Sequence, residues 1–144
     1  PVMDENKHTE IGKIDILRYG TDLVIAATGI MVKKALKAAE ELEKEGIQAA
    51  VLNVHTIKPL DKETLHKIAF PSKKVITVEE HSVIGGLGSA ISEVLSEYGG
   101  YRIRKIGIED CFGQSGDLDE LLEAYGLTVE NIVANALEIW KEPV

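Results

Sequence analysis

Cysteine is nearly absent from this chain, and so are the long apolar runs of membrane proteins and the leader pattern of secreted ones. The single cysteine, Cys111, excludes an internal disulfide and a metal site built from several cysteines, and it indicates a reducing compartment, so we expect a cytoplasmic protein. No apolar run approaches the roughly 18 residues that a membrane-spanning helix requires, so we expect no membrane association. A basic segment followed by an apolar one is also lacking, and we therefore expect no signal peptide.

Positive charge is in deficit. The chain has 16 Lys and Arg residues against 24 Asp and Glu residues, which gives a net charge of −8. A chain of this charge repels nucleic acid and anionic lipid, so neither is expected as a partner.

The rest of the composition is that of an ordinary globular protein. With 144 residues, of which 44% are hydrophobic and 28% charged, the chain is long enough for one domain with a sizeable core. Residues 1–10 are polar and aperiodic and are expected to form a linker or arm, with the domain covering residues 11–144. The first residue, Pro1 rather than Met, favours a fragment or a processed chain.

Hydrophobic periodicity predicts that strands and helices alternate along the chain. Strands are expected at 13–19, 23–27, 47–54, 74–78 and 102–108, and helices at 31–45, 62–69, 87–98, 117–125 and 129–140. Asp61 and Thr128 stand where helices begin, and Gly46 and Gly126 stand where helices end. This alternation predicts parallel strands, helices on both faces of one sheet, and one further strand at the sheet edge.

The loop at residues 79–88 is the most unusual of the loops expected beyond the carboxyl ends of the strands, where ligands gather in open α/β sheets. Gly86 and Gly88 partly match a dinucleotide-binding fingerprint, but Ile91 stands in place of the third glycine. Gly85, Gly86 and Gly88 are therefore the candidates for a cofactor-binding loop. The alternative, which we favour, is that these glycines only shape the turn into the next helix and that this domain binds no cofactor.

His81, in the same loop, is the candidate catalytic residue. Alternate residues of an extended segment share a side, so Glu79 and His81 are expected to lie together. These groups are too few to bind a metal, and no metal site is expected. A histidine here can serve in proton transfer or anion binding, or it can simply pack at an interface, and the last reading is preferred. A pair of Cys111 and His81 is a further option, although a lone cysteine is usually a small buried residue.

The motif at residues 112–116 has a structural interpretation, and the other histidines have no assigned role. Residues 112–116 invite comparison with a nucleophile elbow, but Asp117 stands where that motif needs glycine, so Ser115 or Asp117 is expected to cap the following helix instead. No role is assigned to the other histidines, His8, His55 and His66.

Taken in order, the motifs of this chain resemble the C-terminal domain of transketolase, over about residues 11–140. They are Gly20-Thr21-Asp22, Ala27-Thr28-Gly29, Lys58-Pro59-Leu60-Asp61, Val78-Glu79-Glu80-His81, Gly85-Gly86-Leu87-Gly88, Phe112-Gly113-Gln114-Ser115-Gly116 and Tyr125-Gly126-Leu127-Thr128. The resemblance implies an α/β three-layer sandwich in which a mostly parallel five-stranded sheet has one antiparallel edge strand. Residues 112–116 and the helices after them favour transketolase over 1-deoxyxylulose-5-phosphate synthase and the β subunits of 2-oxo-acid dehydrogenases.

The resemblance also implies that catalysis belongs to other domains of the complete enzyme. In that family, thiamine diphosphate and its Mg²⁺ or Ca²⁺ lie between two other domains at a homodimer interface, and no position of this chain matches the family's catalytic residues. The complete enzyme is expected to move a two-carbon ketol unit between sugar phosphates in the pentose phosphate pathway. This domain would then be non-catalytic, packing against the cofactor-binding domains and supporting dimerisation. The alternatives are the C-terminal domain of one of the two related enzymes, or an independent α/β nucleotide-binding module.

Overall fold

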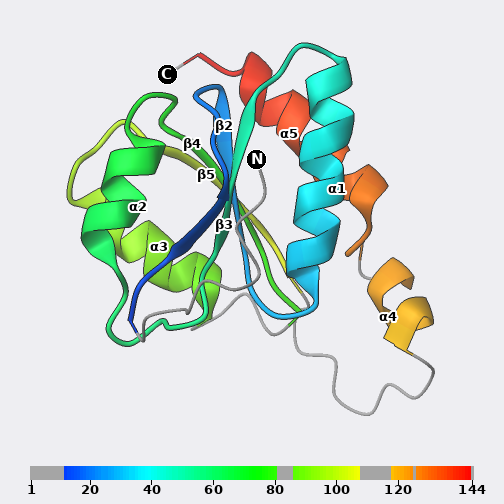
Figure 1. The fold of residues 1–144 in the computed structure, drawn as a ribbon, viewed down its shortest axis with the longest axis horizontal. Helices are drawn as coiled ribbons and strands as arrows, with labels where there is room; N and C mark the ends of the chain where they lie inside the picture. The colour runs from blue at the N-terminus through cyan, green and yellow to red at the C-terminus, as the bar shows by residue number, and fades with distance from the viewer. Residues whose placement is uncertain (1–11, 81–85, 108–117, 125, 144) are drawn as a thin grey trace.

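Five strands and five helices alternate along the part of the chain that the structure, a computed structural model, describes: residues 12–80, 86–107, 118–124 and 126–143 (Figure 1). The strands are β1 (Asp15–Arg18), β2 (Leu23–Ala27), β3 (Ala49–Asn53), β4 (Lys74–Val78) and β5 (Arg102–Ile106). The helices are α1 (Met31–Lys44), α2 (Lys62–Ala69), α3 (Leu87–Ser96), α4 (Leu118–Ala124) and α5 (Val129–Lys141). In these ranges no helix is both long and apolar enough to cross a membrane.

The strands form one sheet in the order β1-β3-β2-β4-β5. β2 pairs in parallel with β3 and with β4, and β4 pairs in parallel with β5. β1 runs antiparallel to β3 at the edge, with an irregularity in register between Ile16 and Arg18. The predicted fold class, a mostly parallel five-stranded sheet with one antiparallel edge strand, is confirmed.

Helices cover both faces of the sheet: α1 and α5 lie on one face, and α2 and α3 lie on the other (Figure 1). The alternation of side chains along β2, which is buried throughout, divides its residues between the two layers. Leu23, Ile25 and Ala27 join the core under α1 and α5, and Val24 and Ala26 join the core under α2 and α3. The continuous apolar run in β2 is thus the sequence signature of a central strand with two buried faces.

The end of α1 explains why β3 starts later than predicted. Gly46 has φ +81 and donates its N–H to Glu43 O at 2.9 Å, and Ile47 donates its N–H to Leu42 O at 3.0 Å. This is the Schellman pattern, in which a glycine in the left-handed conformation closes the helix. Ile47 is buried but belongs to the helix end, so the strand begins at Ala49 instead.

The junction between α4 and α5 uses two local signals that the sequence predicts. Gly126 has φ +74, and the following residue, Leu127, donates its N–H to Leu122 O at 2.7 Å, which closes α4. Thr128 then begins α5, because its hydroxyl accepts the N–H of Asn131 at 3.1 Å. Both predictions, the stop at Gly126 and the cap at Thr128, are confirmed.

Gly20 and Asp22 hold the turn before β2 against the residue that precedes β3. Asp22 donates its N–H to Gln48 O at 3.0 Å, and its carboxylate accepts the N–H of Gln48 at 2.7 Å. A Cβ at Gly20 would lie 2.5 Å from Gln48 O, closer than real Cβ atoms approach oxygen. The Gly20-Thr21-Asp22 motif is therefore a structural clamp between two neighbouring strands.

Asp61 caps α2, as predicted, and also anchors the chain as it enters the sheet. Its carboxylate accepts the N–H of Thr64 at 3.2 Å and the N–H of Ile14 at 3.0 Å. Burial by itself would raise the pKa of Asp61, but the hydrogen bonds from Ile14 and Thr64 outweigh it, and the pKa lies below its ordinary value. One side chain thus joins the start of α2 to the edge strand β1.

Candidate functional site

The loops after β2 and β4 meet at the edge of the sheet formed by the carboxyl ends of the parallel strands. Thr28 donates its N–H to Val78 O at 3.3 Å, which joins the loop after β2 to the end of β4. Gly29 has φ +56, and a Cβ there would lie 2.8 Å from Glu80 Oε1. The loop after β2 therefore fits closely against the half-buried side chain of Glu80.

Glu79, the first residue after β4, turns its carboxylate into the protein and is only 2% exposed. Its Oε1 accepts the N–H of Leu87 at 2.9 Å, and its Oε2 accepts the N–H of Gly88 at 2.8 Å. These are the first amides of α3, which have no carbonyl partner within the helix, and the helix dipole favours negative charge beside them. Glu79 therefore fastens the first turn of α3 to the end of β4.

The two described glycines of this loop have different roles. Gly88 lies where α3 approaches the sheet: a Cβ there would lie 2.8 Å from Thr77 Oγ1 and 2.9 Å from Lys105 Cγ. Gly88 is thus required for space. Gly86 precedes the helix with an extended backbone, φ −98 and ψ −152. Because glycine has no side chain, it cannot cap the helix with a side-chain hydrogen bond. Gly85 lies outside the described residues.

The first turn of α3 does not fit a phosphate group. A phosphate cradle needs free amides at a helix N-terminus, and here the Glu79 carboxylate takes two of them and would repel an anion. Among the described residues, no group of three or more His, Cys, Asp and Glu side chains is arranged to hold a metal ion. The described residues of this loop therefore do not fit the diphosphate of a cofactor such as thiamine diphosphate, and the described part of the chain offers no site for its metal, so we derive no chemical step through them.

Thr77 is an unusual feature beneath α3. The residue is fully buried, and within the part of the chain that the structure describes its hydroxyl has no hydrogen-bond partner. The hydroxyl faces the space that a side chain at Gly88 would fill. No pattern in the sequence marks Thr77 or the inward turn of Glu79, because both depend on how α3 packs on the sheet.

The remaining candidates of this edge stay as predictions. His81, Cys111 and the motif at 112–116 all lie outside the described residues, as do Ser115 and Asp117. The expected proximity of His81 to Glu79 and the optional Cys111–His81 pair are therefore not tested.

The histidines to which sequence analysis assigns no role have clear contacts, except His8, which lies outside the described residues. His55 Nε2 lies 3.4 Å from Asp15 Oδ2, a contact between the end of β3 and the edge strand. His66 stacks on Tyr98 with ring centroids 3.8 Å apart, and its Nδ1 lies 3.4 Å from the Tyr101 hydroxyl. Burial, and then the neighbouring Tyr98, raise the pKa of Tyr101.

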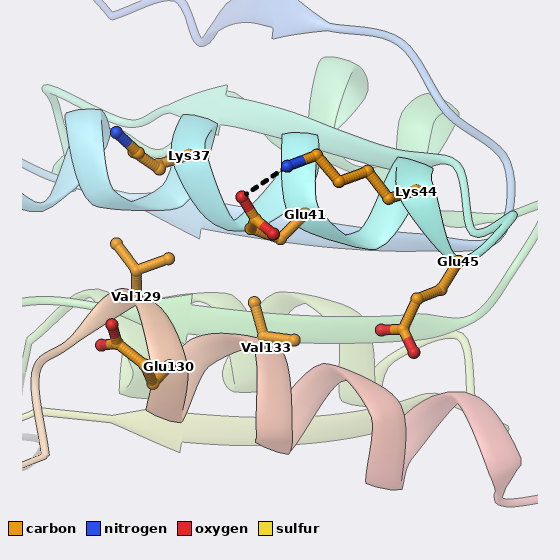
Figure 2. A pocket seen from close by; sticks show the side chains of 7 residues that line it. All are labelled: Lys37, Glu41, Lys44, Glu45, Val129, Glu130 and Val133. Carbon is orange, nitrogen blue, oxygen red and sulfur yellow. Dashed lines mark hydrogen bonds and ion pairs between the residues drawn. The ribbon is translucent and has the colours of Figure 1, made fainter.

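A groove of about 510 Å³ runs between α1 and α5 (Figure 2). Val129 and Val133 of α5 point toward α1 and form its apolar part, and a hydrogen-bonded ion pair between Lys44 Nζ and Glu41 Oε1, 3.1 Å apart, lies on the α1 side. The other lining residues are Lys37, Glu45 and Glu130. The groove brings lysine and glutamate side chains together but no histidine, cysteine, serine or threonine, so we assign it no chemistry.

The chain is similar to known proteins in sequence. The family model described as "Transketolase, C-terminal domain" matches residues 12–132. The 6-deoxy-6-sulfo-D-fructose transketolase subunit SqwH of Clostridium sp. (strain MSTE9) is 50% identical over 94% of this chain and 42% of its own length. The 1-deoxy-D-xylulose-5-phosphate synthase of Heliobacterium modesticaldum is 46% identical over 95% of this chain and 22% of its own length.

A solved structure agrees with these relatives. The structure titled "Split gene transketolase, inactive beta4 tetramer" is 45% identical, superposes with a TM-score of 0.89, and is matched over 97% of this chain and 46% of that chain. The chain thus spans less than half the length of each of these relatives. The family model covers most of the sequence, and the fold superposes closely on the split-gene transketolase, so the resemblance is confirmed: the chain belongs to the family of transketolase C-terminal domains.

Proposed function

We propose that this chain is the C-terminal, non-catalytic domain of a thiamine-diphosphate-dependent enzyme of the transketolase type. In this role the domain packs against the cofactor-binding domains and supports assembly, and it binds neither thiamine diphosphate nor Mg²⁺ itself. The observation that carries the proposal is the bond of the Glu79 carboxylate to the first two amides of α3. That bond fills the one place in the described glycine loop where a phosphate would otherwise be favoured.

For the complete enzyme we favour transfer of a two-carbon ketol unit between sugar phosphates. The relative named as a transketolase subunit is 50% identical to this chain, compared with 46% for the 1-deoxy-D-xylulose-5-phosphate synthase, which supports this order of preference. Synthesis of 1-deoxyxylulose 5-phosphate is the second candidate. The β subunit of a 2-oxo-acid dehydrogenase and an independent nucleotide-binding module come after it, the last because the Glu79 carboxylate opposes an anion at α3.

For the partners we propose cofactor-binding domains that belong partly to another polypeptide, in an assembly with two-fold symmetry. One relative is named as a subunit and another as a split-gene product, which supports a divided enzyme. Residues 1–10 would be a linker or arm, and residues 11–144 the domain itself. The cytoplasm is the proposed location, since a single cysteine suits a reducing compartment.

Calorimetric titration of the chain with thiamine diphosphate and Mg²⁺ tests the absence of a cofactor site. We expect no binding heat from the unmodified chain. The variant Glu79→Ala serves as a comparison, because it frees the two amides and shows whether the loop can bind a phosphate group once the carboxylate is gone. Micromolar affinity in the unmodified chain would overturn the proposal.

Reconstitution with the cofactor-binding domains tests the rest. We expect ketol transfer between sugar phosphates only in the assembled enzyme, and appearance of 1-deoxy-D-xylulose 5-phosphate would support the second candidate instead. In that assembly His81→Ala should leave turnover within a few-fold of the unmodified enzyme. A loss of about 10²-fold with unchanged assembly would contradict a non-catalytic domain, because that is the size expected for a group that transfers a proton.

A further inference from the structure

Aromatic side chains gather on the surface where α2 and α3 end, at the opposite end of the strands from the glycine loop. We call His66, Phe70, Tyr98 and Tyr101 the aromatic patch. Its rings are in contact: His66 stacks on Tyr98 at an interplanar angle of 18°, and its ring centroid lies 5.4 Å from that of Phe70. Phe70 and Tyr98 are nevertheless 55% and 50% exposed. The patch is therefore a continuous aromatic surface that faces water in the single chain.

Exposed aromatic surface of this kind is typical of protein interfaces. A single exposed apolar residue needs no explanation, but rings that contact one another and remain half exposed indicate a surface that a partner covers. Tyrosine and phenylalanine are enriched in interfaces because each ring buries a large area with few rotatable bonds. A groove of about 350 Å³ between α3 and the loop before α2 lies next to the patch. Its lining is partly apolar, with Ala90 and Val94, and partly charged, with Lys58, Lys62, Glu93 and Glu97.

The charges around the aromatic patch differ between its two sides. Lys62, Lys67 and one acidic residue, Glu63, are exposed on the α2 side, and Lys73 Nζ lies 5.2 Å from the Phe70 ring centroid, so this side has a surplus of positive charge. Glu93 and Glu97 are exposed on the α3 side. A two-fold axis through such a surface would place α2 of one copy over α3 of its partner, so each lysine side would meet a glutamate side. The patch is thus complementary to itself in charge as well as in hydrophobicity.

We propose that the aromatic patch is the contact between two copies of this chain, related by a two-fold axis. The proposal rests on the role in assembly proposed above and names the surface that performs it. Its test involves neither cofactor nor activity, so failure of this interface and failure of the proposed function can be told apart.

Sedimentation of the 144-residue chain over a wide range of concentrations tests the aromatic part of the proposal. We expect the unmodified chain to dimerise reversibly, and the double variant Phe70→Ser, Tyr98→Ser to raise the dimer dissociation constant at least about tenfold, since buried aromatic residues dominate interface energies. Tyr19→Ser is the matched control, because Tyr19 is 62% exposed but lies outside the patch. This control should dimerise like the unmodified chain.

A charge exchange tests the two-fold arrangement independently of aromatic contacts. Lys67→Glu and Glu97→Lys should each weaken the dimer, because each places like charges opposite one another. The two changes together should restore the dissociation constant to within a few-fold of that of the unmodified chain, because position 67 of one copy and position 97 of its partner then again carry opposite charges. Circular dichroism confirms that each variant is folded. A chain that stays monomeric at all concentrations, an equal loss in Tyr19→Ser, or a double exchange no stronger than the single changes would overturn the proposal.

Discussion

At the scale of single residues, two glycines matter because they carry no side chain, and neither has a positive φ. A Cβ at Gly20 would lie 2.5 Å from a backbone oxygen of Gln48, and a Cβ at Gly88 would lie 2.8 Å from Thr77 Oγ1. The first neighbour is the backbone of the residue that precedes β3, which cannot move without disturbing the sheet. Among the glycines that the structure describes, Gly20 is therefore the one where we expect the strictest requirement for glycine.

Gly20→Ala should lower the free energy of unfolding by about 1 to 3 kcal/mol, the range found when an extra methyl group is forced into close-packed structure. Denaturant titration followed by circular dichroism measures the change. Thr21→Ala, at the exposed neighbouring position, is the control and should change stability by less than about 0.5 kcal/mol. Equal stabilities for Gly20→Ala and the unmodified chain would show that the turn moves aside freely.

At the scale of elements, α3 differs from α2 and α5 in how it begins. Asp61 caps α2 and Thr128 caps α5, each through the N–H three residues ahead. Gly86 at the start of α3 provides no side-chain cap, and Glu79 supplies the bonds from the end of the preceding strand. The start of α3 therefore depends on the position of β4.

Glu79→Gln should destabilise the domain by about 1 to 3 kcal/mol, because a neutral amide loses the interaction with the helix dipole and can accept from only one of the two N–H groups. Hydrogen exchange of the Leu87 and Gly88 amides measures the local effect, which should be faster exchange in the variant. Glu80→Gln is the matched control at the neighbouring half-buried carboxylate, and it should leave both amides as protected as before. Unchanged protection in Glu79→Gln would contradict the capping role.

Asp61 should make stability depend on pH in the acid range. Its pKa in the folded chain is lower than the ordinary value of 3.8, so the folded state binds the proton more weakly than the unfolded state does. The stabilising contribution is therefore complete above that value and is lost as the pH falls through the lower folded pKa. Asp61→Ala should lower stability by about 1 to 2 kcal/mol at neutral pH, with a difference that narrows in acid.

Denaturant titrations of Asp61→Ala and the unmodified chain at several pH values measure this difference. Glu63→Ala, which removes an exposed carboxylate from the first turn of the same helix, is the control and should show a smaller effect with little dependence on pH. A difference for Asp61→Ala that stays constant down to the most acid pH would contradict the assignment.

At the scale of the whole molecule, the two cores share one sheet. Neighbouring residues of β2 point into opposite layers, so both layers pack on the same strands. Unfolding of either layer would therefore disrupt the sheet on which the other layer packs. We therefore expect the described domain to unfold in one cooperative transition, although the α1–α5 side and the α2–α3 side have separate sets of contacts.

Leu65→Ala tests this coupling, because Leu65 is fully buried on the α2–α3 side, whereas Trp140, the one tryptophan of the chain, lies at the end of α5 on the other side. The change should lower stability by about 2 to 5 kcal/mol, and tryptophan fluorescence and circular dichroism should report the same shifted midpoint. Leu42→Ala, the equivalent deletion under α1, is the matched comparison. A fluorescence midpoint that Leu65→Ala leaves unshifted would show that the two sides unfold separately.

The fold was predictable from sequence because its signals are local. The uninterrupted apolar run of β2 and the helical spacing of α1 predict a central strand and a covering helix, and the cap at Asp61 and the stop at Gly46 act through residues within one helical turn. The ends of some elements were less predictable. Ile47 has the character of a strand residue, but its N–H closes α1, which shortens β3.

The sequence by itself therefore determined the order of the elements, the α/β class and the family, since periodicity, turn residues and caps depend on near neighbours in the chain. Only the tertiary structure decided the roles of Glu79, Gly88 and His66. Glu79 turns inward to cap α3, Gly88 gives room to Thr77 and Lys105, and His66 stacks on Tyr98. These contacts join residues of different elements, and their partners are set by how helices pack on the sheet, which no local pattern encodes.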